Sequence, residues 1–123
     1  MTFTRPIRAV AAGAVLCAGV LAAGEAEAAY AAIAFSQTSG AAGYWYGAAS
    51  EGAAEDRALG QCGSGCSVVI WTRDACAALA VGAGNGYGSY WSTSRSGAIN
   101  GAINECAART SGCRLNTIVC SGN

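Results

Sequence analysis

Cys62-Gly63-Ser64-Gly65-Cys66 is the stretch that decides the fold of this chain, because its pattern returns later in the sequence. Cys106 repeats the first cysteine, and Ser111-Gly112-Cys113 repeats Ser64-Gly65-Cys66. Upstream of each copy lies a Tyr-Trp pair, Tyr44-Trp45 and then Tyr90-Trp91. The sequence therefore predicts one unit written twice. After a segment that we expect to be removed, residues 29–123 form a single domain of two repeats, at about 30–72 and 73–120.

Each repeat shows the same order of elements: strand, strand, helix, strand. In the first strand Ile33 and Phe35 alternate with alanines, and Leu79 and Val81 do the same in the second copy, as side chains alternate across a strand. A glycine-bearing turn follows each of these strands and favours a hairpin. The expected strands are 31–35, 44–46 and 68–71, and then 77–81, 87–91 and 115–119.

A helix with a serine cap is predicted between the second and third strands of each repeat. Ser50 and Ser94 are suited to accept the unpaired amide hydrogens of the first turn, and Gly63 suits the end of the first helix. In the second helix the residues of one face are Ala98, Ile99, Ala102, Ile103 and Cys106. The simplest architecture is an α+β fold, an antiparallel or mixed sheet with both helices on one face. The predicted core is Ile33, Phe35, Leu59, Val68 and Ile70, with Leu79, Val81, Ile99, Ile103 and Leu115.

The N-terminus is typical of a secretory signal peptide. Arg5 and Arg8 precede an apolar run over 9–24, and Ala26-Glu27-Ala28 offers small residues at the two positions that a signal peptidase reads. The run is shorter than the roughly 20 residues that span a bilayer. We therefore expect cleavage after Ala28, no stable membrane insertion afterwards, and a secreted or periplasmic protein.

Cleavage would leave six of the seven cysteines, an even set that predicts disulfides in an oxidising compartment. Zinc is the competing interpretation, but the chain has no histidine and only one closely spaced cysteine pair. In each repeat one cysteine ends the helix and the next begins the following strand. Symmetry therefore favours, among fifteen possible connectivities, the pairs Cys62–Cys66, Cys106–Cys113 and Cys76–Cys120.

Composition argues against several classes of function. The chain has no histidine, which removes the usual catalytic triads, and no lysine. Its net charge of zero argues against nucleic acid as a partner. Glu55 and Asp56 are adjacent on the expected helix and diverge by about 100°, so they do not form a glycosidase pair. Gly82 to Gly88 is a hairpin turn rather than a phosphate loop. We expect no enzyme activity, no metal and no cofactor.

Several motifs together resemble the bacterial domain-of-unknown-function family 4189. They are the strand Ala31-Ile33-Phe35, the aromatic return strand, the alanine-rich helix ending in cysteine, Gly65-Cys66-Ser67-Val68-Val69-Ile70-Trp71, Asp74-Ala75-Cys76-Ala77-Ala78-Leu79-Ala80 and a closing cysteine strand. The resemblance covers Tyr30 to Cys120. It implies an exported module, sometimes appended to a larger protein, and supplies no activity and no catalytic residues.

The aromatic return strands are the most informative surface for function. Tyr44, Tyr46 and Tyr90 are the expected contacts to an unknown protein or glycan partner, although packing within the sheet would explain the same residues. Two classes of function remain. One is a non-catalytic, exported binding or interaction module of the envelope or medium. The other is an inhibitor or immunity-type protein that blocks an enzyme with a rigid loop, at 36–42 or 82–88.

Overall fold

A computed structural model describes residues 28–122 of the chain. The predicted signal peptide, residues 1–28, therefore lies outside the described residues except for Ala28. The first repeat contains β1 (Tyr30–Phe35), β2 (Ala42–Ala48), α2 (Glu51–Cys62) and β3 (Ser67–Arg73). The second contains β4 (Cys76–Val81), the 3-10 turn η3 (Ala83–Asn85), β5 (Tyr87–Ser92), α3 (Arg95–Ala107) and β6 (Arg114–Cys120). The α+β class and the duplicated order of elements are thus confirmed.

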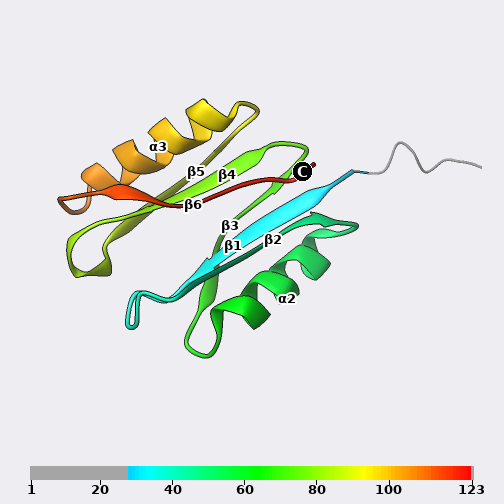
Figure 1. Cartoon of the computed structure of the whole chain (residues 1–123), viewed down its shortest axis with the longest axis horizontal. Coiled ribbons are helices and arrows are strands. Elements are labelled where there is room, and N and C mark those ends of the chain that lie inside the picture. Colours follow the sequence, from blue (N-terminus) through cyan, green and yellow to red (C-terminus); the bar gives the residue numbers. More distant parts are fainter. Residues whose placement is uncertain (1–27, 123) are drawn as a thin grey trace, which may run out of the picture.

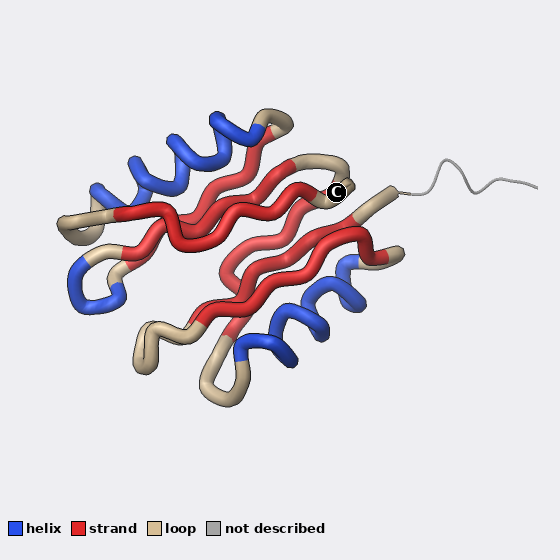
Figure 2. The backbone as a smooth tube through the Cα atoms, viewed as in Figure 1, coloured by secondary structure: helices blue, strands red, loops and turns tan. Residues whose placement is uncertain are grey.

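The six strands form two antiparallel sheets of three strands each. The first repeat builds the order β2-β1-β3 and the second builds β5-β4-β6, so the first strand of each repeat is central. The sheets face each other, and each carries its helix on its outer side (Figures 1 and 2). The molecule therefore has four layers, in the order helix, sheet, sheet, helix.

The single sheet with both helices on one face was a wrong prediction. The central strands show why, because both of their faces are buried. Ile33 and Phe35 of β1 pack with Leu79 of β4 between the sheets, in one apolar cluster. The alanines that alternate with them face the helices instead: Ala32 and Ala34 contact α2, while Ala78 and Ala80 contact α3. Alternation predicts which residues share a face, but it does not say what covers that face.

Both helices use alanine as their contact residue. Ser50 accepts the backbone N–H of Ala53 at 3.1 Å, and Ser94 accepts that of Gly97 at 3.0 Å, so both predicted caps are confirmed. In α3 the fully buried residues are Ala98, Ala102 and Cys106, whereas Ile99 and Ile103 are half-buried at the sides of the helix. Of the predicted core, Ile33, Phe35 and Leu79 are buried and Leu115 is exposed.

Each helix lies directly on its sheet because the strand beneath it has a glycine at the point of contact. A Cβ added to Gly43 would overlap the backbone of Ala58 and Cys62, and one added to Gly88 would overlap that of Ala102 and Cys106. Both glycines face the last turn of the helix from equivalent positions. Both positions therefore require glycine because two backbones approach each other closely, and not because of turn geometry.

The three predicted disulfides are present, each with the predicted partner. Cys62–Cys66 and Cys106–Cys113 join the end of each helix to the start of the next strand. Cys76 and Cys120 face each other across β4 and β6 and are also bonded. Two of these disulfides therefore join consecutive elements of the chain, and the third joins two strands that are paired in the sheet.

Candidate binding surface

Large aromatic side chains are exposed on strands rather than on loops. Tyr44 and Tyr46 stand on β2, Trp71 on β3, and Tyr90 and Trp91 on β5. Each of these side chains is between 43% and 56% exposed. These strands are the edges of their sheets. The structure thus places Tyr44, Tyr46 and Tyr90, the predicted partner contacts, at the surface, together with two tryptophans.

The strand register changes the equivalence of the two Tyr-Trp pairs. Tyr44 lies opposite Ile33, on the face between the sheets, whereas Tyr90 lies opposite Ala78, on the face toward α3. Trp45, opposite Ala32, is the true counterpart of Tyr90. The two pairs, which the sequence repeat places at equivalent positions, are therefore offset by one position in the strands.

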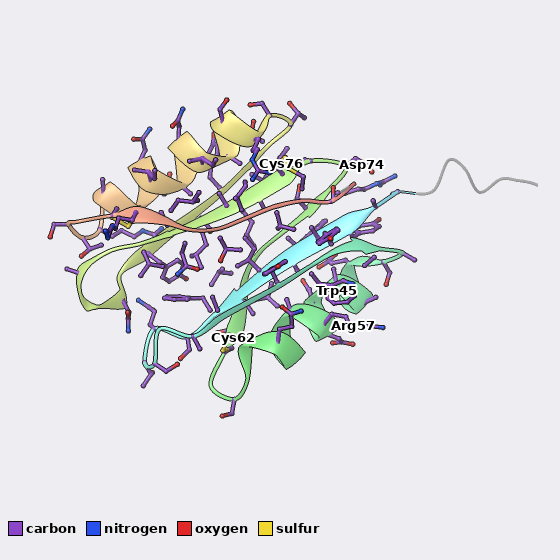
Figure 3. The ribbon with its side chains drawn as sticks, viewed as in Figure 1. Trp45, Arg57, Cys62, Asp74 and Cys76 are labelled. Atoms are coloured by element: carbon purple, nitrogen blue, oxygen red, sulfur yellow. A yellow bond between two sulfur atoms is a disulfide. The ribbon has the colours of Figure 1, made fainter. Side chains whose placement is uncertain are left out.

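The offset has a consequence for packing against the helices. The guanidinium of Arg57 on α2 lies 4.7 Å from the centre of the Trp45 ring, so a cation covers this side chain (Figure 3). At the corresponding place on α3 stands Gly101, where an added Cβ would overlap the ring of Tyr90. Tyr90 therefore rests on bare helix backbone and keeps its outer face open.

The predicted tyrosines do not form one site. The face-to-face sheets bring β2 next to β6 at one edge and β3 next to β5 at the other. At the first edge Tyr44 and Tyr46, with Trp45 and Gln61, line a depression of about 380 Å³. Tyr90 belongs to the second edge.

At this second edge two depressions share Trp91, and one of them is also lined by Trp71. We call this region the tryptophan surface. One depression, of about 450 Å³, is lined by Ile70, Ser89, Tyr90, Trp91, Ser92 and Thr93. The other, of about 360 Å³, is lined by Trp71, Thr72, Arg73 and Trp91. The surface thus combines residues of both repeats, with hydroxyl groups and one cation as well as aromatic rings among its lining residues.

Neighbouring contacts hold the tryptophan surface in place. The ring centres of Tyr30 and Trp71 are 6.2 Å apart, and the guanidinium of Arg73 lies 5.9 Å from the Tyr30 ring. Across the two sheets, the Ser89 hydroxyl donates to the carbonyl of Val69 at 3.4 Å. The surface is therefore preformed by both sheets rather than carried on a free loop.

Sequence reasoning missed the two tryptophans as a unit. The sequence predicts a strand at Trp71 and pairs Trp91 with its neighbour Tyr90. Neither residue carries a local signal for the other, because β3 and β5 belong to different sheets. Only the packing of sheet on sheet brings them to one edge.

The acidic side chains of α2 gather away from this surface. Burial raises the pKa of Glu55, and a hydrogen bond with Glu51 and the charges of Glu51 and Asp56 raise it further. These carboxylates therefore crowd one another on α2. None of the three depressions described above is lined by them. Within residues 28–122 no group of three or more His, Cys, Asp or Glu side chains is placed to hold a metal ion.

In the described part of the chain, no helix has the length and apolar character needed to cross a membrane.

Comparison with known proteins gives a family and a fold. The model of a family described as Domain of unknown function (DUF4189) matches residues 30–120. The NMR structure of Rv1813c from Mycobacterium tuberculosis is similar, with a TM-score of 0.58 and 26% sequence identity. The alignment covers 75% of this chain and 74% of that one. No curated protein matches the chain.

Proposed function

Because the chain belongs to the DUF4189 family of domains of unknown function, we propose its role from its own geometry. The protein is an exported, non-catalytic module that binds a neutral carbohydrate chain at the tryptophan surface. One observation carries this proposal: exposed tryptophans from two different repeats line adjoining depressions on one edge of the molecule.

The side chains of the tryptophan surface suit a sugar. Indole rings offer large apolar faces on which the C–H faces of a pyranose can lie, and they lose little conformational freedom on binding. Ser92, Thr93 and Arg73 line the same depressions, and their hydroxyl and guanidinium groups can bond sugar hydroxyls. An apolar face flanked by such polar groups matches the alternating chemistry of a carbohydrate.

Charge favours a neutral ligand. Arg73 is the only charged residue among those that line the two depressions. The full chain has seven positive and seven negative residues. Cleavage after Ala28 would remove Arg5, Arg8, Glu25 and Glu27, two of each sign, so the balance would remain. A polyanion such as nucleic acid would find no positive patch here.

Export and the lack of catalysis belong to the same proposal. The signal-like N-terminus and three disulfides support an oxidising compartment outside the cytoplasm. The lack of histidine and lysine in the sequence leaves few groups for general acid–base chemistry. A rigid aromatic surface with no nearby carboxylate pair supports binding rather than bond cleavage.

The test is binding of the mature protein to an array of neutral polysaccharides and oligosaccharides, compared with the Trp71→Ala, Trp91→Ala double variant. We expect the double variant to bind at least about tenfold more weakly, since buried aromatic anchors dominate such contacts. Circular dichroism must show an unchanged fold. The matched control is Tyr44→Ala, Tyr46→Ala, which removes two equally exposed rings from the opposite edge and is expected to bind normally.

Two results would contradict the proposal. Absence of binding to any neutral glycan would exclude a neutral carbohydrate as the ligand. Loss of binding in the tyrosine variant, with binding by the tryptophan variant unchanged, would show that the binding site lies on β2, which carries two of the three tyrosines predicted from the sequence.

The inhibitor alternative is favoured by one observation, the bracing of the two hairpin loops. The Asn85 side chain donates to the carbonyl of Gln37 at 3.0 Å, and Ser36 accepts the backbone N–H of Ser39 at 3.2 Å. A loop held in this way resembles the rigid loops that block enzymes. Inhibition of an envelope hydrolase that is lost in Asn85→Ala but kept in the tryptophan variant would support this function instead.

A further inference from the structure

Both ends of the described chain meet at the linker between the repeats, Asp74-Ala75. Ala75 donates its N–H to the Ser121 hydroxyl at 2.7 Å, and Ser121 donates its N–H to the Ala75 carbonyl at 2.7 Å. On the other side, Asp74 donates its N–H to the Ala29 carbonyl at 2.9 Å. The nitrogen of Ala29 in turn donates to Oδ1 of Asp74 at 3.0 Å. Ala29 is thus held by both the backbone and the carboxylate of Asp74.

The nitrogen of Ala29 is the atom that signal-peptide cleavage after Ala28 would release. In that step water adds across the Ala28–Ala29 peptide bond. Ala28 keeps the new carboxylate, and the Ala29 nitrogen becomes an amino group that is protonated at neutral pH. An amide with one hydrogen thereby becomes an ammonium with three donors and a positive charge, 3.0 Å from a carboxylate oxygen.

We infer that Asp74 is the receptor for the mature N-terminus: processing creates an ammonium–carboxylate pair, absent from the precursor, that latches the first strand onto the linker between the repeats. This inference is independent of the carbohydrate ligand. It also selects the cleavage site, because only a chain that begins at Ala29 places its ammonium on Asp74.

The surroundings of Asp74 are arranged for this role. Its Oδ2 faces Nε of Arg73 at 3.8 Å, which leaves Oδ1 for the chain end. Asp74 adopts a φ of 53°, a left-handed conformation that aspartate tolerates better than most residues. Arg73 continues over the ring of Tyr30, which packs on Trp71. The latch therefore fixes the start of β1 beside the tryptophan surface.

The sequence offers a clean measurement. The chain contains no lysine, so the α-amino group is the only primary amine of the mature protein. Acylating reagents react with the neutral amine, and an ion pair favours the protonated form and raises the pKa of the amino group. The experiment is the rate of N-terminal acylation near neutral pH, in mature protein obtained by processing in the cell and checked by intact mass.

We expect Asp74→Asn to be acylated about two- to fivefold faster than the unmodified mature protein, the range that corresponds to an exposed ion pair. Glu105→Gln is the control for net charge, and its rate should equal that of the unmodified protein. A second chain keeps Asp74 and adds one glycine before Ala29. This chain should react as fast as Asp74→Asn, and its own Asp74→Asn variant should show no further increase.

Three outcomes would overturn the latch. A processed protein that begins elsewhere, for example at Glu27, would place the ammonium away from Asp74. Equal rates for Asp74→Asn and the unmodified protein would show that the pair does not form. An equal effect of Asp74→Asn in the glycine-extended chain would show a general charge effect. Because the acylation rates are measured without a ligand, they test the latch independently of carbohydrate binding.

Discussion

Glu55 shows how one side chain on α2 responds to its neighbours. Glu55 is partly buried, and its carboxyl shares a hydrogen bond with Glu51 and lies near the charge of Asp56. All of these raise its pKa, so the folded protein binds this proton more tightly than the unfolded chain does. The stability that Glu55 contributes is therefore complete below its ordinary pKa and is lost as the pH rises through its folded value.

Glu55→Gln should accordingly raise the free energy of unfolding at pH 7, by less than about 1 kcal/mol for a site near the surface. The gain should vanish below about pH 4, where the glutamate is protonated in both states. Urea unfolding at the two pH values measures this. The control, Glu105→Gln, removes a carboxylate that faces Arg109 at 3.9 Å and should give no gain at pH 7. A gain for Glu55→Gln of the same size at both pH values would contradict the explanation.

At the scale of elements, each helix is positioned by the absence of side-chain atoms on the strand beneath it. The contact between α3 and β5 depends on Gly88, which meets the backbone of Ala102 and Cys106. Alanine is then the largest residue that α3 presents fully buried to the sheet, apart from Cys106. The low apolar bulk of both helices is thus a requirement of close packing.

This geometry predicts opposite effects for two glycine-to-alanine changes. Gly88→Ala should cost about 1–3 kcal/mol or more, because the added methyl group forces the helix away from the sheet. Gly60→Ala, on α2, meets no atom within 4 Å and should stabilise by up to about 1 kcal/mol through better helix propensity. Thermal and urea unfolding of the two variants measure the difference. Similar midpoints for both would show that the helix does not sit as closely on β5 as described.

At the scale of the whole molecule, two similar units share one apolar interface between their sheets. Ile33 and Leu79, fully buried, come from equivalent positions of the two central strands. Each unit has its own helix layer but only half of this central layer. We therefore infer that the two repeats depend on each other for folding, and that covalent staples supplement a core rich in alanine.

The disulfides should contribute unequally to global stability. Cys76 and Cys120 are separated by 44 positions, and Cys62 and Cys66 by 4. From the loss of chain entropy in the unfolded state, removal of the longer link by Cys76→Ser with Cys120→Ser should cost about 4 kcal/mol. Removal of the shorter link by Cys62→Ser with Cys66→Ser should cost about 2 kcal/mol. Chemical denaturation compares them, and equal midpoints would argue against a loop-length effect.

The sequence by itself determined the helices, the strands and the disulfides that join them. Caps such as Ser50 and Ser94, the alternation around Ile33 and Leu79, and cysteines at element ends are local signals, and local interactions decide where helices and strands begin and end. The pairing of six cysteines followed from the symmetry of the repeat.

Only the tertiary structure decided how these elements are layered and where the candidate site lies. The alternation in β1 shows that the strand has two distinct apolar faces, but it does not show which element packs on each face. An architecture of one sheet and an architecture of two sheets therefore both fit the alternation. The register of Tyr44 and Tyr90 depends on which strand residue faces a helix, and this is set by the fit of Gly43 and Gly88 beneath α2 and α3. Trp71 and Trp91 line one depression because one sheet packs on the other, an arrangement of two different repeats that no local pattern encodes.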